Sequence, residues 1–347
     1  MNRKLVFVTV FLIVICSGSI FLIQHSSGRP LDDDVKVGLY YYVWYNEGDG
    51  SRHWNDEPCN TAVDKPILGY YNSRNVTIIK QHLGWFNQLN ISFLIISWWG
   101  PNSYEDNTTD IIFSTVQQNN YPIEIAIMVE AYNRSGVYHF KAIYDYINNT
   151  YVAPYESIYM KLNDLPLVCF FNDNINMTRT EANRTAIRSV TGFSARIIGH
   201  SNYVDWWAWP LAGYGEAPEP KLSKDGYIGI LPRYDDTHLP NRTNTIYDVN
   251  YTEGLYDMQW NEVLSNVSKV NYVGIYSWNE CHERSQIEPH INPYGKYVLS
   301  PFCKTYHYIQ IIPEFPSFLI LPLFMIATLL AVMVYRTKLT SGHSKSR

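Results

Sequence analysis

Short apolar runs that alternate with stretches of helical character constrain the fold of this chain more than any other feature. The runs are rich in β-branched and aromatic residues and occupy residues 37–45, 91–99, 123–131, 165–171, 195–200, 227–232 and 273–279, with a further run around 204–209. The clearest helical stretch, residues 75–89, has one apolar stripe, made by Ile78, Ile79, His82, Leu83 and Phe86. Strands that alternate with helices pack as a parallel sheet. About 270 residues lie between the apolar segments at the two ends of the chain, which is the usual size of one barrel. The sequence therefore predicts an α/β fold, a (β/α)8 TIM-type barrel over residues 36–306.

Large aromatic and polar residues follow the apolar body of most predicted strands. They are Trp44, Tyr45, Trp98, Trp99, Glu130, Tyr132, Asn172, His200, Arg233, Tyr234, Asn279 and Glu280. In a parallel barrel the carboxyl ends of all strands meet at one face, and a polar group buried there without a partner costs about 1–3 kcal/mol. We therefore expect these residues to line an open cleft at that face.

Both ends of the chain carry apolar segments. Residues 1–26 place an apolar run after Arg3 and Lys4, which is the pattern of a signal peptide or signal anchor. Residues 317–335 are uncharged and long enough for a transmembrane helix across a core of about 30 Å. This helix follows a linker at 307–316 and precedes a basic tail at 336–347, which the positive-inside rule places in the cytoplasm. The sequence predicts a cell-surface domain, anchored in the membrane by its C-terminal helix.

Two further signals agree with this location. Asn-x-Ser/Thr sequons, the acceptors of N-glycosylation, begin at Asn75, Asn90, Asn107, Asn133, Asn148, Asn176, Asn183, Asn241, Asn250 and Asn266. Residues 313–317, PEFPS, resemble the PEF-type C-terminal sorting signal of archaeal surface proteins. That signal implies exchange of the helix for another anchor, so an exchanged anchor and a simple membrane helix both stay open.

The composition limits the classes of partner that the protein can bind. The net charge of −5 provides no basic field for nucleic acid. The sequence has no Cys or His spacing typical of zinc and no complete nucleotide-binding loop, so we expect neither a zinc site nor a nucleotide-binding loop. The 29 Tyr and 10 Trp residues supply flat rings with polar tips, which suit the binding of sugars. An oligosaccharide or polysaccharide is the expected partner.

Residues 277–289, SWNECHERSQIEP, hold the densest set of reactive side chains. Glu280 and Glu283 stand three residues apart at a predicted strand end, and both face the cleft if the chain turns after Glu280. Cleavage of a glycosidic bond uses one carboxylic acid that protonates the leaving oxygen and a second carboxylate at the sugar ring. Two carboxylates a few ångströms apart keep one of them protonated near neutral pH. The segment therefore predicts a glycosidase-like pair.

This segment resembles the SWNEWHEGTQIEP signature of glycoside hydrolase family 99, the endo-α-mannosidase and endo-α-mannanase family. Other stretches agree in order: YYYVWY (40–45) with RHW (52–54), GYYNS (69–73), SWWG (97–100), VEAY (129–132), PRYDDT (232–237) and EGLYDMQW (253–260). The resemblance spans residues 37–290. It implies a retaining, endo-acting hydrolase of α-mannose-like glycans on a (β/α)8 barrel, without a metal or an organic cofactor.

Roles follow from the resemblance by position. It implies that Glu280 is the base that deprotonates the sugar 2-hydroxyl, and that Glu283 protonates the leaving oxygen and then activates water. The predicted substrate-binding residues, which include these family positions, strand-end residues and two histidines, are Tyr41, Tyr42, Trp44, His53, Trp98, Trp99, Glu130, Tyr132, Tyr234, Asp235, Trp278, Asn279 and His282. The choice between Tyr41 and Tyr42, and between Trp98 and Trp99, stays open.

The segment departs from the signature at three positions. Cys281 replaces a Trp, Arg284 a Gly and Ser285 a Thr. If Arg284 faces Glu283, its charge lowers the pKa of that carboxyl, and it strains the backbone if the glycine had a positive φ. Two alternatives therefore remain. One is a glycan-assembly transferase, because relatives of the signature occur among polysaccharide-biosynthesis proteins. The other is a catalytically silent glycan-binding surface protein.

Overall fold

The computed structural model describes residues 35–46, 53–54, 64–130, 132, 140–171, 181–199, 206–208, 220–239, 242 and 245–312. All of them belong to one compact unit, Val35–Pro313. The segments predicted for export and anchoring, 1–26 and 317–347, lie outside the described residues. Among the helices that are described, none is long and apolar enough to cross a bilayer.

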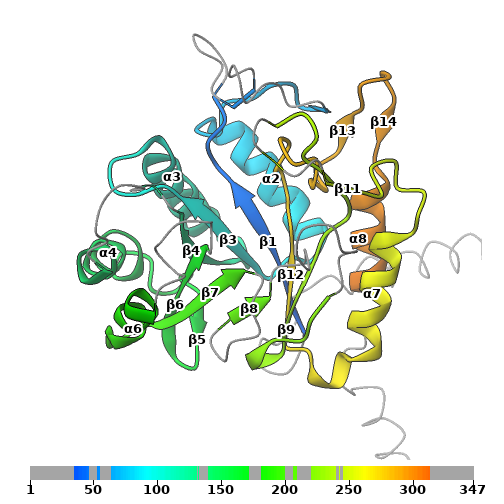
Figure 1. Cartoon of the computed structure of the whole chain (residues 1–347). Helices are drawn as coiled ribbons and strands as arrows, with labels where there is room; N and C mark the ends of the chain where they lie inside the picture. The colour runs from blue at the N-terminus through cyan, green and yellow to red at the C-terminus, as the bar shows by residue number, and fades with distance from the viewer. Residues whose placement is uncertain are drawn as a thin grey trace, which may run out of the picture. The chain divides into compact units, whose positions relative to one another are not determined.

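Eight parallel strands form the main sheet (Figure 1). They are β1 (Lys36–Tyr42), β3 (Phe93–Trp98), β4 (Glu124–Val129), β6 (Leu165–Phe171), β7 (Ser194–Gly199), β8 (Trp206–Ala208), β9 (Tyr227–Ile230) and β12 (Tyr272–Ile275). Each of them overlaps one of the predicted runs, including the run around 204–209. A short strand, β5 (Lys161–Leu162), pairs antiparallel with β6.

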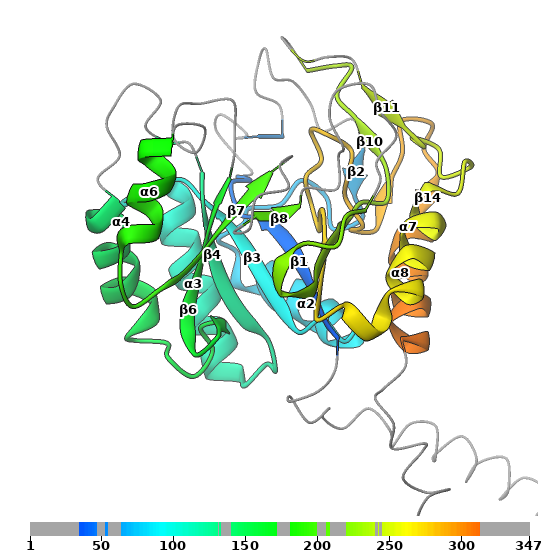
Figure 2. The same cartoon turned by 60° about the horizontal axis from the view of Figure 1, so that its bottom comes forward.

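The strand order, β8-β7-β6-β4-β3-β1-β12-β9, is that of a TIM-type barrel. Neighbours in the chain are neighbours in the sheet, and the last strand, β12, pairs with β1 at Gly38↔Gly274. The sheet is curled, as Figure 2 shows. No ladder joins the end strands β8 and β9 in the described part of the chain, but the Trp207 and Tyr227 rings stack between them with centroids 4.3 Å apart.

Helices follow the strands on the outside of the curled sheet (Figure 1). They are α2 (Val76–Gln88), α3 (Tyr104–Asn119), α4 (Phe140–Ile147), α6 (Glu181–Ser189), α7 (Leu255–Ser265) and α8 (Ser300–Ile311), with short turns η1 (Asn148–Val152), η2 (Lys224–Gly226) and η3 (Val267–Lys269). Asn75 caps α2, since its side chain accepts a hydrogen bond from the Thr77 amide at 2.9 Å. Because α8 continues to Ile311, the first residues of the predicted 307–316 linker are helical.

Five short strands lie outside the main sheet. β10 (Tyr234–Asp235) pairs with β11 (Ile246–Tyr247), while β13 (His290–Ile291) pairs with both β2 (Lys65–Pro66) and β14 (Tyr297–Val298). These pairs fix the loops that follow β1, β9 and β12.

Alternation along the strands divides the core into two layers. In β1, Tyr40 and Tyr42 belong to the cluster inside the curl, whereas Leu39 and Tyr41 belong to the cluster under the helices. Glycine at position 38 makes room for an inner ring, because a Cβ there would lie 2.2 Å from the Phe93 ring.

Candidate active site

The segment that follows β12 folds back on itself at the carboxyl end of the strand. The Ser277 amide donates to the Ser285 carbonyl at 3.0 Å, and the Ile287 amide donates to the Ser277 carbonyl at 2.9 Å. Residues 281–284 form a turn between these two arms. Glu280 and Glu283 therefore lie at the tip of this loop, at the end of the sheet where β1 also ends.

Asn279 fixes this loop to β1. Its Oδ1 accepts from the Tyr42 amide at 2.9 Å, and its Nδ2 donates to the Tyr42 carbonyl at 2.7 Å. The Tyr45 hydroxyl donates to the Asn279 carbonyl at 2.7 Å. The side chain of Asn279, predicted to bind substrate, is thus fully buried and engaged with the backbone. It sets the position of Glu280.

Hydrogen bonds fix both the backbone and the carboxylate of Glu280. Its amide donates to Ser277 Oγ at 2.6 Å, and its Oε1 accepts from the His282 amide at 2.9 Å. The same oxygen lies 3.2 Å from His282 Nδ1, and only 4% of the Glu280 side chain is exposed. His282 is fixed in turn, because its Nε2 donates to the His53 carbonyl at 2.7 Å.

Glu283 is the more exposed carboxylate, with 13% of its side chain accessible. Its Oε2 accepts a hydrogen bond from the Tyr276 hydroxyl, and its Oε1 lies 3.2 Å from Nη2 of Arg242. Burial and then the charge of Glu280 raise the pKa of Glu283 to about 7, against the lowering effect of Arg242 and Tyr276. Glu283 therefore retains its proton close to neutral pH, as a general acid requires.

Three further predicted residues surround the two carboxylates. Burial raises the pKa of Tyr42, and the nearby charges of Glu130, Glu280 and Glu283 raise it further. Burial and then the charge of Glu283 raise the pKa of Tyr234. Glu130 accepts a hydrogen bond from Ser97 Oγ at 2.8 Å.

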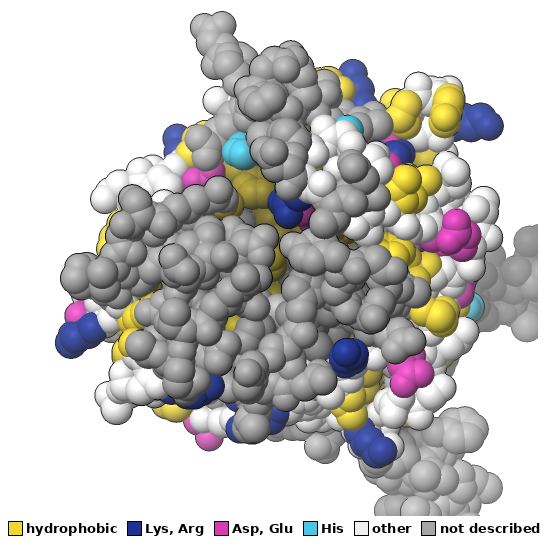
Figure 3. All heavy atoms as spheres, in the orientation of Figure 1, with side chains coloured by type: hydrophobic (Ala, Val, Ile, Leu, Met, Phe, Trp, Pro, Cys, Tyr) yellow, Lys and Arg dark blue, Asp and Glu magenta, His cyan; other side chains and the backbone are white. Residues whose placement is uncertain are grey.

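Aromatic rings extend the site beyond the acids. The Trp44 ring stacks on His53 with centroids 4.6 Å apart and lies 6.1 Å from Trp99 and 5.7 Å from His282. Such rings offer apolar faces that suit sugar C–H groups. Figure 3 shows hydrophobic side chains with a basic and an acidic side chain beside them near the middle of one face of the molecule.

Four predicted residues are not brought into this group. Tyr41, Trp98 and Trp278 are at most 2% exposed and face the helices. The Tyr41 hydroxyl bonds His82 Nδ1 at 2.8 Å, Trp98 Nε1 donates to Asp106 at 2.7 Å, and the Trp278 ring packs edge-on against Phe86 at 4.7 Å.

Tyr132, the fourth of these residues, is partly buried and packs edge-on against Trp98, with centroids 5.7 Å apart. Tyr41, Trp98 and Trp278 were expected to bind substrate in the cleft, and their buried positions under the helices differ from that expectation. The reason on the strands is alternation: Tyr41 and Trp98 point to the opposite side of the sheet from Tyr42 and Ser97.

The side chain of Arg284 does not face Glu283, although its position in the sequence allowed that. Its φ of +49° lies in the left-handed region, but its guanidinium turns to Asp64, with Nε 2.9 Å from Oδ2, and to Asp235, with Nη1 2.9 Å from Oδ2. Asp235, a predicted substrate-binding residue, also accepts from Thr237 Oγ1 at 2.6 Å. The side chains of Arg284 and Asp235 therefore pair with each other beneath the loop.

Two residues that contact Glu283 were not singled out by the sequence. Tyr276 lies in a predicted strand, but the apolar pattern there gives no reason to separate it from its neighbours. Arg242 lies between the paired strands β10 and β11, and nothing near it in the sequence marks a functional site. Its proximity to Glu283 results from the chain path alone.

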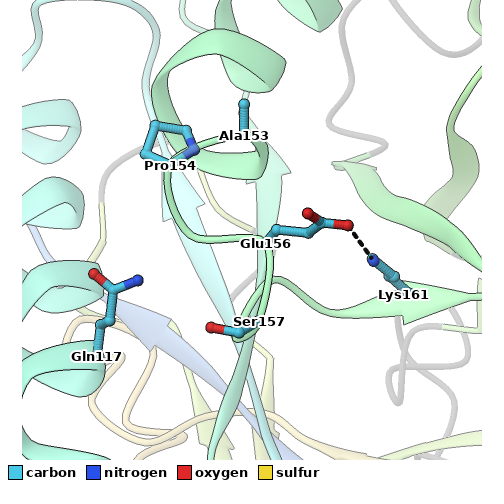
Figure 4. A pocket seen from close by; sticks show the side chains of 6 residues that line it. All are labelled: Gln117, Ala153, Pro154, Glu156, Ser157 and Lys161. Atoms are coloured by element: carbon cyan, nitrogen blue, oxygen red, sulfur yellow. Dashed lines mark hydrogen bonds and ion pairs between the residues drawn. The ribbon is translucent and has the colours of Figure 1, made fainter.

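The described residues include no group of His, Cys, Asp and Glu that could hold a metal ion. Cys169, Cys281 and Cys303 are free thiols, and Cys59 lies outside the described residues. A surface pocket of about 410 Å³ lies at the amino ends of β4 and β6, away from Glu280 (Figure 4). It is lined by Gln117, Ala153, Pro154, Glu156, Ser157 and Lys161, and Glu156 pairs with Lys161 across 3.2 Å.

Comparison with known proteins agrees with this geometry. No family model matches the chain. By sequence it is 23% identical over 313 residues to the glycoprotein endo-alpha-1,2-mannosidase of Xenopus laevis, which covers 72% of this chain and 69% of the relative. It is 24% identical over 314 residues to the glycoprotein endo-alpha-1,2-mannosidase of Rattus norvegicus, covering 73% of this chain and 67% of the relative.

Solved structures agree at the level of the fold. The GH99 endo-alpha-mannosidase from Bacteroides thetaiotaomicron superposes with a TM-score of 0.62 at 19% identity, over 82% of this chain and 98% of that structure. A structure described as a glycoside hydrolase-like protein superposes with a TM-score of 0.50 at 15% identity, over 81% of this chain and 96% of its own. By sequence and by fold, the chain is therefore similar to the endo-alpha-mannosidases of glycoside hydrolase family 99.

Proposed function

We propose that this protein is a retaining, endo-acting glycoside hydrolase of α-mannose-like glycans, with Glu280 and Glu283 as its catalytic residues. The observation that supports this most directly is the difference between the two carboxyl groups. Glu280 accepts hydrogen bonds and faces His282, whereas burial and the charge of Glu280 raise the pKa of Glu283 to about 7. One group is prepared to accept a proton and the other to donate one.

The proposed reaction has two steps. In the first, Glu280 takes the proton of the sugar 2-hydroxyl while that oxygen bonds to the anomeric carbon, and Glu283 gives its proton to the departing glycosidic oxygen. The product of this step is a 1,2-anhydro sugar. In the second, Glu283 takes a proton from water, the water oxygen bonds to the anomeric carbon, the bond from that carbon to O2 breaks, and Glu280 returns its proton to O2. Two displacements at one carbon retain its configuration.

The test is an assay of the chain on α-mannan and on mannose-rich N-glycans, with products read by mass spectrometry. Glu280→Gln and Glu283→Gln are each expected to lower kcat by about 10²–10⁴-fold, the usual contribution of a general acid or base. Glu253→Gln is the matched control, because that side chain is exposed and lies before α7, away from the loop. Turnover that survives both active-site substitutions would remove the mechanism.

We also propose that the domain is displayed outside the cell and held there through its C-terminal apolar segment, or through an anchor exchanged for it. The support is the sequence alone, with uncharged residues 317–335 before a basic tail. Protease added to intact cells should degrade the domain. Full protection of the domain in intact cells, with degradation after lysis, would place it inside instead.

A further inference from the structure

One ring nitrogen of His282, Nε2, must carry a proton because it faces a backbone carbonyl. The carbonyl oxygen of His53 can only accept a hydrogen bond, so the Nε2 that lies 2.7 Å from it carries a proton. In a neutral imidazole the other nitrogen, Nδ1, then has a lone pair and no proton. Nδ1 is the atom that lies 3.2 Å from Oε1 of Glu280.

A lone pair and a carboxylate oxygen at this distance repel each other unless a proton lies between them. The contact therefore requires one additional proton, carried either by the imidazole or by the carboxyl group. Glu280 Oε1 already accepts a hydrogen bond from the His282 amide at 2.9 Å, so the oxygen that faces Nδ1 acts as an acceptor. Burial penalises a charge that has no partner, and here the two groups are buried together, with side chains that are 9% and 4% exposed.

We propose that His282 is a positioning residue of the reaction: as an imidazolium it holds Glu280 in the carboxylate form, so that Glu283 and not Glu280 carries the acid proton. This inference rests on the proposed function for its meaning in catalysis. Two buried glutamates in one site otherwise compete for a single proton. The cation on one side of Glu280 makes the two carboxyl groups inequivalent.

The surroundings of His282 agree with the charged form. Burial alone lowers its pKa, but the hydrogen bond and charge of Glu280 outweigh burial, and the His53 carbonyl and Glu283 act in the same direction, so the pKa is raised. Other titratable groups close to it include His53, whose ring centroid lies 5.4 Å from that of His282, and His238, whose pKa is lowered by burial. The Tyr45 ring stacks over the imidazole with centroids 6.0 Å apart.

The first test does not depend on turnover. Long-range ¹H–¹⁵N NMR spectra of the full chain, labelled on histidine, report the proton on each ring nitrogen, and the His282 signals are those that vanish in His282→Asn. At pH 7 we expect both nitrogens of His282 to be protonated in the wild type. In Glu280→Gln we expect a neutral ring with its proton on Nε2. A neutral His282 in the wild type, or an imidazolium that persists in Glu280→Gln, would overturn the pair.

The second test separates positioning from mere packing. In His282→Gln the amide reaches the Nε2 position and keeps the bond to the His53 carbonyl, while the group that faces Glu280 is lost. In His282→Asn a neutral N–H donor takes the place of Nδ1. For His282→Gln we expect kcat/KM to fall by about 10- to 100-fold, the cost of a lost charge-assisted hydrogen bond.

The pH profile gives the decisive readout. In His282→Gln the acid limb of kcat/KM moves to higher pH, because a carboxylate without its cationic neighbour takes up a proton more readily. His282→Asn restores part of the activity and part of this shift. Loss of activity with an unmoved acid limb in both variants would show a packing role only. If the wild type has no hydrolase activity, the proposed function fails while the NMR result still decides the Glu280–His282 pair.

Discussion

Arg284 follows Glu283 directly in the chain, yet its guanidinium pairs with Asp64, with Nε 2.9 Å from Oδ2. The carboxylates of Asp64 and Asp235 occupy both sides of the guanidinium. The basic side chain that acts on Glu283 is instead Arg242, which comes from a different loop. Arg284, which stands where the signature that the segment resembles has a glycine, thus adds an ion-pair network without facing Glu283.

The left-handed backbone at position 284 predicts an unusual order of stability. Because φ is +49° there, alanine pays the cost of a side chain in that region, about 1 kcal/mol, and glycine does not. Both substitutions lose the bonds to Asp64 and Asp235, so Arg284→Gly is expected to be more stable than Arg284→Ala by that amount. Urea unfolding measures the difference, and equal stability would argue against the left-handed backbone. Both variants should retain most of the hydrolase activity.

Removal of the Asp64 charge is expected to weaken the fold strongly. Asp64 is buried and contacts both Arg233, at 2.6 Å, and Arg284. Burial by itself raises its pKa, but Arg233 and Arg284 outweigh burial and lower it to about 2. Asp64→Asn leaves Arg233 without its anion and Arg284 with Asp235 alone, and should cost about 3–5 kcal/mol at pH 7.

The pH dependence of Asp64→Asn has a definite sign. A depressed pKa stabilises the fold above the unfolded value of 3.8, and this contribution disappears as pH falls through about 2. The gap between wild type and variant, measured by urea unfolding, should therefore narrow from pH 5 to pH 3. Asp145→Asn is the control, since its pair with Lys141 is largely exposed and contributes less than about 1 kcal/mol. A constant gap would contradict the ion-pair account.

The charge of Arg242 should set the alkaline limit of the proposed reaction. Its guanidinium, 48% exposed, lowers the pKa of Glu283, although burial and Glu280 raise that pKa to about 7 overall. In Arg242→Met the pKa of Glu283 rises, so the alkaline limb of kcat/KM moves to higher pH. Arg188→Met in α6 serves as a control with a distant, exposed arginine. A limb that stays in place would show that Arg242 does not act on the acid.

Glu283 should also make the wild type less stable as pH rises. Its pKa is raised from 4.5 to about 7, so the folded state binds the proton more tightly than the unfolded state. Stability is then lost between about pH 4.5 and pH 7, by on the order of 3 kcal/mol at most. Glu283→Gln does not titrate, so its stability relative to the wild type should increase from pH 5 to pH 8 in urea unfolding. The same offset at both pH values would mean that Glu283 is not perturbed.

The fold was accessible from the sequence because the strands are short and strongly apolar. All eight runs correspond to strands of the main sheet, and the stripe of residues 75–89 corresponds to α2 (Val76–Gln88). The burial of Ile79, Leu83 and Phe86 in that helix follows directly from their spacing. Local pattern and tertiary packing agree at these positions, and so the prediction from the sequence succeeds.

Only part of the candidate site could be predicted from the sequence. The signature located Glu280 and Glu283, but it gave no direction for side chains at the strand ends. Tyr41 and Tyr42 are equivalent as letters, and only the alternation of the observed strand sends one to His82 and the other to the carboxylates. Arg242 could not be found at all, because its contact with Glu283 depends on a loop path that no periodicity encodes.

The bond between Asn279 and Tyr42 joins residues that are 237 positions apart. One amide group thus connects the first strand of the main sheet to the segment after the last strand of that sheet, and Glu280 lies one residue beyond that connection. A nascent chain that has left the ribosome only as far as β9 already has seven of the eight parallel strands of the main sheet but lacks both glutamates. The two glutamates can therefore reach their positions only after residues 277–283 have been synthesised and have met β1.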